Sequence, residues 1–164
     1  HHRYIHSFPT RRSSDLRENH PFNQSRTMSL EESVEFNLDW AGQRRFQGRV
    51  DRISSRRDGI YEIHDYKTGR KIPDQAELMD DRQLTLYQVA VQEMHPKAAQ
   101  VELVWHFLSR GVSFRLRRTQ SDLLHVLQDT NRLVDRIECE ERFPANTGPL
   151  CDWCEFRNIC PAWR

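Results

Sequence analysis

Hydrophobic and polar residues alternate along the first half of the chain with the period of two that is typical of half-buried β-strands. In residues 33–40 every second residue is apolar, so this segment is predicted to be a strand. Residues 45–54 and 60–67 show similar runs, and the sequence Arg-Asp-Gly at 57–59 is typical of a hairpin loop between them. The three segments predict a meander.

Helical spacing replaces this alternation in two later segments. Apolar residues three and four apart predict a helix that begins at about Gln75 or Asp80 and ends at Met94. A second helix is predicted over residues 121–138, where a capping-box sequence precedes an apolar stripe.

Residues 101–108 and 112–118 predict a second hairpin around Arg110-Gly111. Together the elements predict an α/β domain whose central mixed sheet is flanked by helices. Residues 4–16 resemble translated sequencing-adapter read-through, so the natural N-terminus is expected to be missing. The predicted division is a non-native or disordered leader at 1–16, a polar linker at 17–32, a core at 33–142 and a C-terminal cysteine-rich segment at 143–164.

The 164 residues suffice for one domain with a hydrophobic core and are too few for two. Hydrophobic residues make up 37%, and no apolar run approaches the roughly 20 residues that span a bilayer, so a cytoplasmic protein with no membrane partner is expected. The 25 Lys and Arg nearly balance the 24 Asp and Glu, so any nucleic-acid site must be a local patch.

Two acidic residues and a lysine fall inside the second and third predicted strands, where unpaired acids are costly. Side chains alternate along a strand, so Asp65 and Lys67 project from the same side, and Asp51 can reach them from the neighbouring strand. Carboxylates are hard oxygen ligands. Asp51 and Asp65, together with the backbone carbonyl of Tyr66, therefore form a candidate Mg²⁺ or Mn²⁺ site.

This grouping is suited to hydrolysis of a phosphodiester. A bound metal would lower the pKa of a water molecule, and Lys67 would orient that water or stabilise charge on the phosphorus oxygens. The alternative reading is structural. Asp51 would pair with a neighbouring arginine on a solvated face, and Asp65 with Lys67 would be a surface ion pair. The spacing alone favours neither strongly, because D-x-K is short and common.

Three of the four cysteines lie within the last 14 residues, as Cys151, Cys154 and Cys160 in the pattern C-x2-C-x5-C-P. This spacing lets three thiolates face one inorganic centre, and it fits both zinc and a [4Fe–4S] cluster. Either centre leaves one position open. Cys139 is a candidate for it, although its place near the end of an amphipathic helix is typical of an ordinary buried thiol. Three unligated thiols are the remaining alternative.

Arginines gather around the second predicted strand and at the end of the last one. Phosphate binding is the functional interpretation, because the planar guanidinium can bind two oxygens, and solubility on exposed strands is the alternative. The residues are Arg44, Arg45, Arg49, Arg52, Arg56, Arg57, Arg115, Arg117 and Arg118.

Three motifs in this order resemble the PD-(D/E)xK nuclease superfamily, and its RecB/AddB-type exonuclease branch in particular. They are G-R-V-D-R-I at 48–53, D-Y-K-T-G at 65–69 and Q-L-x-x-Y at 83–87. The resemblance implies a restriction-endonuclease-like core. It also implies that Asp51 and Asp65 are metal ligands, that Lys67 is the catalytic lysine, and that Gln83 and Tyr87 support the active site and the DNA strand.

The same resemblance implies a Mg²⁺- or Mn²⁺-dependent DNA exonuclease of repair or recombination, forming the C-terminal part of a larger protein with a helicase subunit or domain as partner. It implies that Cys151, Cys154 and Cys160 join a lone upstream cysteine to hold a [4Fe–4S] cluster. The branch also brings a histidine or acidic metal ligand from an upstream helix. No residue here is matched to that ligand, since His20 lies in a polar, proline-containing stretch.

Two other functions stay open at this point. One is a non-catalytic DNA-binding module that is stabilised by the cluster and has an incomplete metal site. The other is a protein-interaction domain held together by zinc.

Overall fold

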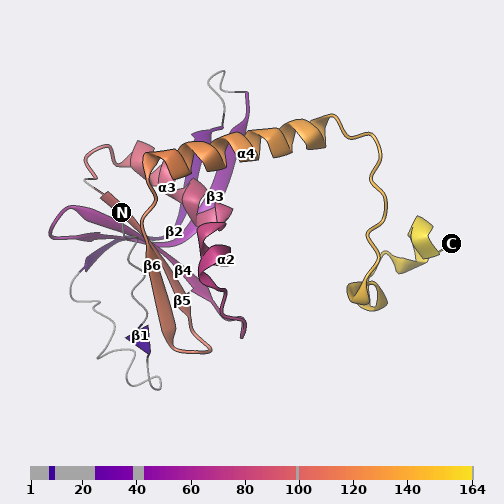
Figure 1. Ribbon diagram of the computed structural model, residues 1–164, viewed down its shortest axis with the longest axis horizontal. Coiled ribbons are helices and arrows are strands. Elements are labelled where there is room, and N and C mark those ends of the chain that lie inside the picture. The colour runs from indigo at the N-terminus through magenta and orange to yellow at the C-terminus, as the bar shows by residue number, and fades with distance from the viewer. Residues whose placement is uncertain (1–7, 10–24, 39–42, 99, 164) are drawn as a thin grey trace. The chain divides into compact units, whose positions relative to one another are not determined.

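The chain divides into two compact units, residues 1–131 and 132–164, and each is described by itself. No helix in the described residues is long and apolar enough to cross a membrane. The computed structural model describes the following parts of the chain (Figure 1): residues 8–9, 25–38, 43–98 and 100–163.

A six-stranded mixed sheet forms the first unit, with two helices in the connection between two of its strands and a third helix after the last strand. The predicted α/β class, with a central mixed sheet and flanking helices, is confirmed. The elements are β1 (Phe8–Pro9), β2 (Ser25–Asn37), β3 (Arg45–Arg56), β4 (Ile60–Lys67), α2 (Gln75–Met79), α3 (Arg82–Met94), β5 (Gln100–Phe107), β6 (Val112–Leu116) and α4 (Gln120–Glu138).

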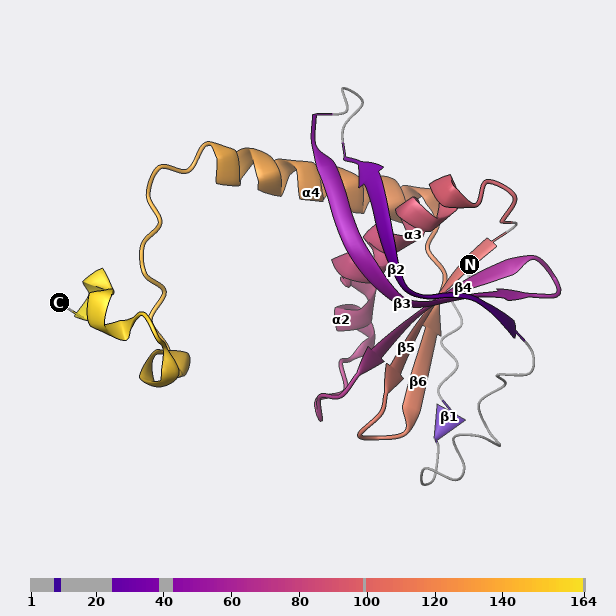
Figure 2. The same cartoon turned by 180° about the vertical axis from the view of Figure 1, so that it is seen from behind.

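The strand order is β1-β6-β5-β4-β3-β2, and every neighbouring pair is antiparallel except β4 and β5. Parallel neighbours need a crossover, which α2 and α3 provide. Figure 2 shows β4, β5 and β6 side by side. The parallel pairing runs from Ile60 beside Gln100 to Lys67 beside Phe107, so the loops that follow β4 and β5 leave the same edge of the sheet.

The hydrophobic core lies between α3 and the face of the sheet that carries the odd-numbered residues of β4 and β5. Ile63, Leu103 and Trp105 on the strands are almost fully buried, as are Leu84 and Val91 on α3. The alternation in β4 and the helical spacing in α3 thus produce matching apolar surfaces. Burial of this surface supplies most of the driving force for folding.

The N-terminal part differs from the sequence prediction. β2 begins at Ser25, eight residues before the predicted start, so residues 25–32 of the predicted polar linker belong to the sheet. β2 is an edge strand held by backbone pairing with β3, and such pairing does not require apolar side chains. Phe8 and Pro9, within the predicted leader, pair with β6. The rest of that leader and residues 17–24 lie outside the described residues.

The predicted first helix is two helices, because the chain turns at Asp80 and Asp81 and each helix has its own acidic cap. Asp74 caps α2 and Asp81 caps α3. The second hairpin and α4 are confirmed with shifts of one or two residues at their ends. In the second unit, the cysteine-rich segment forms three short 3-10 turns, η1 (Pro149–Trp153), η2 (Arg157–Ile159) and η3 (Pro161–Trp163).

The opposite face of the sheet carries a buried polar network that the sequence analysis did not identify. Ser54 Oγ donates a hydrogen bond of 2.9 Å to Glu62 Oε2, and Arg115 donates one of 2.6 Å to Glu62 Oε1. His64 continues the network, with its Nε2 2.8 Å from Ser54 Oγ and its Nδ1 2.9 Å from His106 Nε2. These side chains join four neighbouring strands.

The network holds Glu62 in its charged form. Burial by itself would raise the pKa of Glu62, but hydrogen bonds from His64 and Arg115 hold it far below its ordinary value. Burial lowers the pKa of His64, and this effect outweighs the neighbouring Glu62 carboxylate, which favours protonation. At neutral pH the network therefore contains an ionised glutamate and an uncharged imidazole.

Replacing Glu62 by Gln should destabilise the protein by about 1 to 3 kcal/mol at pH 7, because Arg115 loses one of its two carboxylate partners and keeps only Glu102. A carboxyl whose pKa is lowered on folding contributes stability above its unfolded pKa and loses it as the pH falls. The gap between wild type and Glu62→Gln should therefore narrow below about pH 4.3. Urea denaturation at several pH values measures this.

The control for this experiment is Glu93→Gln, which makes the same chemical change at an exposed position of α3. It should alter the free energy of unfolding by less than about 0.5 kcal/mol. A Glu62→Gln protein as stable as wild type at pH 7 would contradict the assigned role of Glu62.

Candidate active site

Asp51, Asp65 and Lys67 lie together where the pairing between β3 and β4 ends. The last paired residues there are Arg52 and His64. Beyond them, the backbone N–H of Tyr66 donates a 2.8 Å hydrogen bond to Asp51 Oδ2. A side chain thus takes the place of the next bond between the strands, which satisfies a backbone donor and fixes Asp51 beside the end of β4.

Asp65 is the most constrained acid of the group. Its side chain is 9% exposed, and Lys67 Nζ lies 3.1 Å from Oδ1 and 2.9 Å from Oδ2. Only the contact with Oδ1 has hydrogen-bond geometry, so the buried Oδ2 atom accepts no hydrogen bond. Oδ2 instead lies against the Lys67 ammonium as an ion pair, so Lys67 is the cationic partner that this buried carboxylate oxygen needs.

The charges of the site act on one another. Burial raises the pKa of Asp65, the Lys67 ammonium opposes this, and the nearby acids Asp51 and Asp81 add to the rise. Burial would lower the pKa of Lys67, but Asp65 and the same two acids raise it. The arrangement therefore favours additional positive charge next to Asp65.

The donor set fits a hard divalent cation in kind, since Asp51 and Asp65 offer carboxylate oxygens. Within the described residues, however, no group of three or more His, Cys, Asp or Glu side chains is gathered in a way that would hold a metal ion. The predicted ligation by the carbonyl of Tyr66 stays a prediction.

Gln83 and Tyr87 approach the lysine from α3. Lys67 Nζ donates to Gln83 Oε1 at 3.4 Å, and Gln83 Nε2 donates to the Tyr87 hydroxyl at 3.1 Å. The two residues are one helical turn apart, so they share one face of α3. The structure thus links four of the five predicted side chains by contacts, and it joins the fifth, Asp51, to the backbone of Tyr66 between Asp65 and Lys67.

Gly48 explains how Tyr87 fits against the sheet. A Cβ atom at position 48 would lie 2.4 Å from Tyr87 Cε1, which is far closer than two carbon atoms can approach. Tyr87 is 7% exposed and packs edge-on against Phe46. Only glycine gives the Tyr87 ring this place beside β3.

Asp81 is a positioning residue that the sequence analysis missed. Its Oδ1 accepts a 3.0 Å hydrogen bond from Leu84 N, which caps α3, and its Oδ2 accepts one of 2.8 Å from Trp105 Nε1. Trp105 lies beside Asp65 in the β4–β5 pairing. Asp81 therefore fixes the start of α3, and with it Gln83, against the strand next to the site. An aspartate before an apolar helix was the available signal.

The four cysteines are free thiols in the second unit. Cys139 and Cys154 are exposed, whereas Cys151 and Cys160 are half-buried. The Cys151 sulfur accepts a hydrogen bond from Gly148 N at 3.3 Å. In the part of the chain that is described, they are not gathered into a metal-holding group.

A mixed sheet with helices on it, carrying carboxylates and a lysine at the end of a central strand, defines a restriction-endonuclease-like α/β fold. The chain belongs to the PD-(D/E)XK nuclease superfamily, which its residues 2–161 match. Members of this superfamily are generally hydrolytic nucleases that typically use divalent metals.

A solved structure, the crystal structure of SSO0001, is similar to this chain with 22% sequence identity and a TM-score of 0.48. The similarity covers 92% of this chain and 66% of that one, so the chain spans about two thirds of the length of SSO0001. No curated protein matches the chain.

Gly48→Ala should destabilise the protein by about 1 to 3 kcal/mol, because the added methyl group forces Tyr87 away from β3. Denaturant unfolding measures this effect. The matched control is Gly69→Ala, since a Cβ atom at position 69 meets nothing within 4 Å. If the two variants unfold at the same denaturant concentration, the close fit between Gly48 and Tyr87 does not contribute to the free energy of unfolding.

Proposed function

We propose that this chain is the nuclease part of a larger protein and hydrolyses DNA phosphodiesters with Mg²⁺ or Mn²⁺. The finer proposal is an exonuclease of the RecB/AddB type in DNA repair or recombination, working with a helicase subunit or domain. The observation that carries the nuclease proposal is the convergence of Asp51, the buried Asp65 and Lys67 at the end of β4.

The acids would hold the cation. Asp51 is fixed by a hydrogen bond from Tyr66 N, and Asp65 is held beside Lys67. When bound there, a Mg²⁺ or Mn²⁺ ion supplies a water molecule of lowered pKa and shields the charge of the phosphate. Preorganised side chains bind a metal more tightly, because the conformational entropy of ordering them is already lost when the protein folds.

Lys67 would act on the substrate. Its side chain is 38% exposed, in contrast to the buried Asp65, so the ammonium group is the part of the pair that an incoming phosphate can reach. Its hydrogen bonds to Asp65 and Gln83 hold the ammonium at one place. An ammonium so placed stabilises charge that develops on the phosphorus oxygens.

A non-catalytic DNA-binding module is the second candidate. It is favoured by one observation, that the described residues contribute two acids rather than three or more ligands to the proposed cation site. In that case Asp51, Asp65 and Lys67 would be structural, and the exposed arginines would carry the binding.

Lys67→Ala should reduce DNA hydrolysis by about 10²-fold or more, because developing charge loses its nearest cationic donor. Removal of divalent metal with EDTA should abolish hydrolysis. The assay follows degradation of a labelled oligonucleotide with Mg²⁺ and with Mn²⁺. Lys97→Ala, at an exposed lysine after α3, is the control and should retain full activity.

Background-level degradation by the wild-type chain together with its upstream sequence, with both metals, would overturn the nuclease proposal. If that inactive chain still binds DNA, the non-catalytic module is the better description. Equal rates for wild type and Lys67→Ala would remove Lys67 from the mechanism.

A [4Fe–4S] cluster on Cys151, Cys154 and Cys160 is the cofactor proposal for the second unit. It is supported by the C-x2-C-x5-C-P spacing and by the resemblance to the RecB/AddB-type branch. Three free thiols are soft donors that suit iron or zinc in kind. The centre would be structural, and an upstream cysteine would complete it.

Anaerobically purified protein, with its upstream sequence, should show visible iron–sulfur absorbance and contain iron and sulfide. Cys154→Ser should lose both signals. Cys139→Ser should retain them, because Cys139 is not expected to be a ligand. Zinc without iron would instead indicate a zinc-stapled domain, and loss of the cluster in Cys139→Ser would identify Cys139 as the fourth ligand.

A further inference from the structure

Two loops are fastened together at the edge of the sheet next to the proposed active site. The turn after β5 is joined to the segment after β4 by three hydrogen bonds. Leu108 N donates to Lys67 O at 2.9 Å, Ser109 Oγ to Gly69 O at 2.8 Å, and Arg110 Nε to Arg70 O at 3.2 Å. The parallel pairing of β4 and β5 makes this contact possible, since both strands end at this edge.

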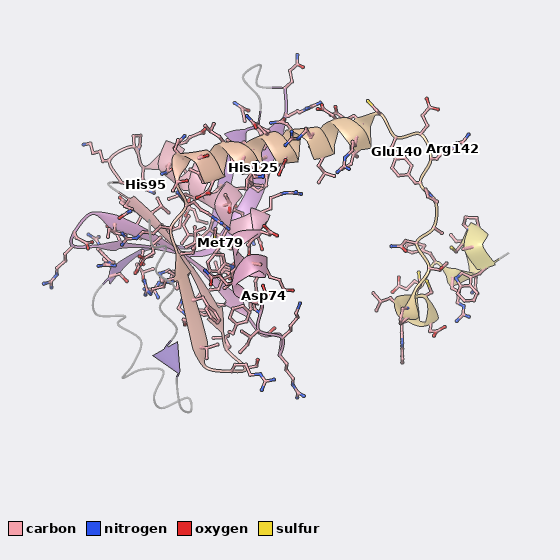
Figure 3. All side chains as sticks on the ribbon, viewed as in Figure 1. Asp74, Met79, His95, His125, Glu140 and Arg142 are labelled. Carbon is pink, nitrogen blue, oxygen red and sulfur yellow. The ribbon has the colours of Figure 1, made fainter. Side chains whose placement is uncertain are left out.

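The contact brings basic side chains together. Arg70 and Arg110 are exposed and joined through the Arg70 carbonyl, and Lys67 precedes Arg70 by three residues. Neither residues 67–73 nor residues 108–111 contain an acid, and the neighbouring Lys71 is paired with Glu77 of α2. We call Lys67, Arg70 and Arg110 the basic clip. Figure 3 labels Asp74, which caps α2 just beyond this segment.

Lys67 is paired with Asp65, so the positive charge that is open to an anion at this edge lies on Arg70 and Arg110. Some arginines of the sheet have acidic partners: Arg45 contacts Glu35, and Arg56 contacts Asp58 and Glu102. Arg110 instead donates to the backbone carbonyl of Arg70, and both residues are exposed. Guanidinium groups are strong phosphate ligands.

We propose that Arg70 and Arg110 bind the backbone phosphates of the nucleic-acid strand on one side of the phosphate held at Lys67. The inference rests on the proposed nuclease function and adds where the strand runs, over the joined loops after β4 and β5. Contacts of this kind fix the register of the strand without reading its sequence. The hydrogen bonds from the turn after β5 to Lys67 O and Gly69 O then set the distance between the bound phosphates and the catalytic lysine.

The test measures DNA binding without hydrolysis. Fluorescence anisotropy of a labelled single-stranded oligonucleotide of about 20 nucleotides, longer than the site of a typical single-strand binding fold, is recorded in EDTA at several salt concentrations. Arg70→Ala/Arg110→Ala should bind about tenfold more weakly near 0.1 M salt. The slope of log affinity against log salt should shrink by about 1.4, which is 0.7 for each lost phosphate contact.

The matched control is Arg26→Ala/Lys97→Ala, which removes two positive charges at the other end of β4 and β5. Lys97 lies three residues before Gln100, which pairs with Ile60, roughly 25 Å from Lys67 along a strand of eight residues. Arg26 pairs with Ser55 next to the hairpin between β3 and β4. This control should keep the wild-type slope, because its two basic residues lie outside the basic clip. Circular dichroism and thermal unfolding of both double variants establish that they are folded.

The outcomes separate this inference from the nuclease proposal. An unchanged slope in Arg70→Ala/Arg110→Ala, or an equal reduction in both double variants, would contradict phosphate binding by Arg70 and Arg110. This holds even if the wild type degrades DNA. A reduced slope in the clip variant alone supports it, even if no degradation is seen with Mg²⁺ or Mn²⁺. Ser109→Ala should give a smaller loss of affinity by loosening the loop contact.

Discussion

The hydrogen bond between Tyr66 N and Asp51 Oδ2 is the interaction on which the rest of the site depends. It lies where β3 and β4 stop pairing, so an acid of one strand completes the backbone bonding of the other. This contact holds the Asp51 carboxylate near that of Asp65, and the charge of Asp51 helps to raise the pKa of Asp65. The bond satisfies the backbone donor of Tyr66 and fixes the carboxylate of Asp51 at the same time.

The strand and helix periods were enough to predict the class of fold, because burial of one face dictates them. Ile63 on β4 and Leu84 on α3 show how each pattern marks its core side. Polar segments held by backbone bonds leave no such pattern, and β2 before residue 33 was missed for that reason. The break between α2 and α3 was missed because Asp80 and Asp81 fit both a helix surface and a cap.

The contacts among Asp51, Asp65 and Lys67 could be anticipated, since strand alternation and short-range pairing bring them together. Trp105 and Gly48 could not be connected to the site from the sequence, because their partners, Asp81 and Tyr87, lie 24 and 39 residues away. The network of Glu62 and its neighbours was hidden for a different reason. Polar residues at alternate positions read as a solvated face, and only the packed sheet reveals that they are buried.

The order of the chain has a consequence for how the site assembles during synthesis. All five residues proposed for catalysis precede β5, yet α3 is fixed through Trp105 and the loop after β4 through Leu108 and Ser109. β5 must therefore emerge and insert beside β4 before the site is rigid. Non-local parallel pairing is slow to form. A nascent chain would thus carry the complete set of catalytic side chains while still lacking an ordered site.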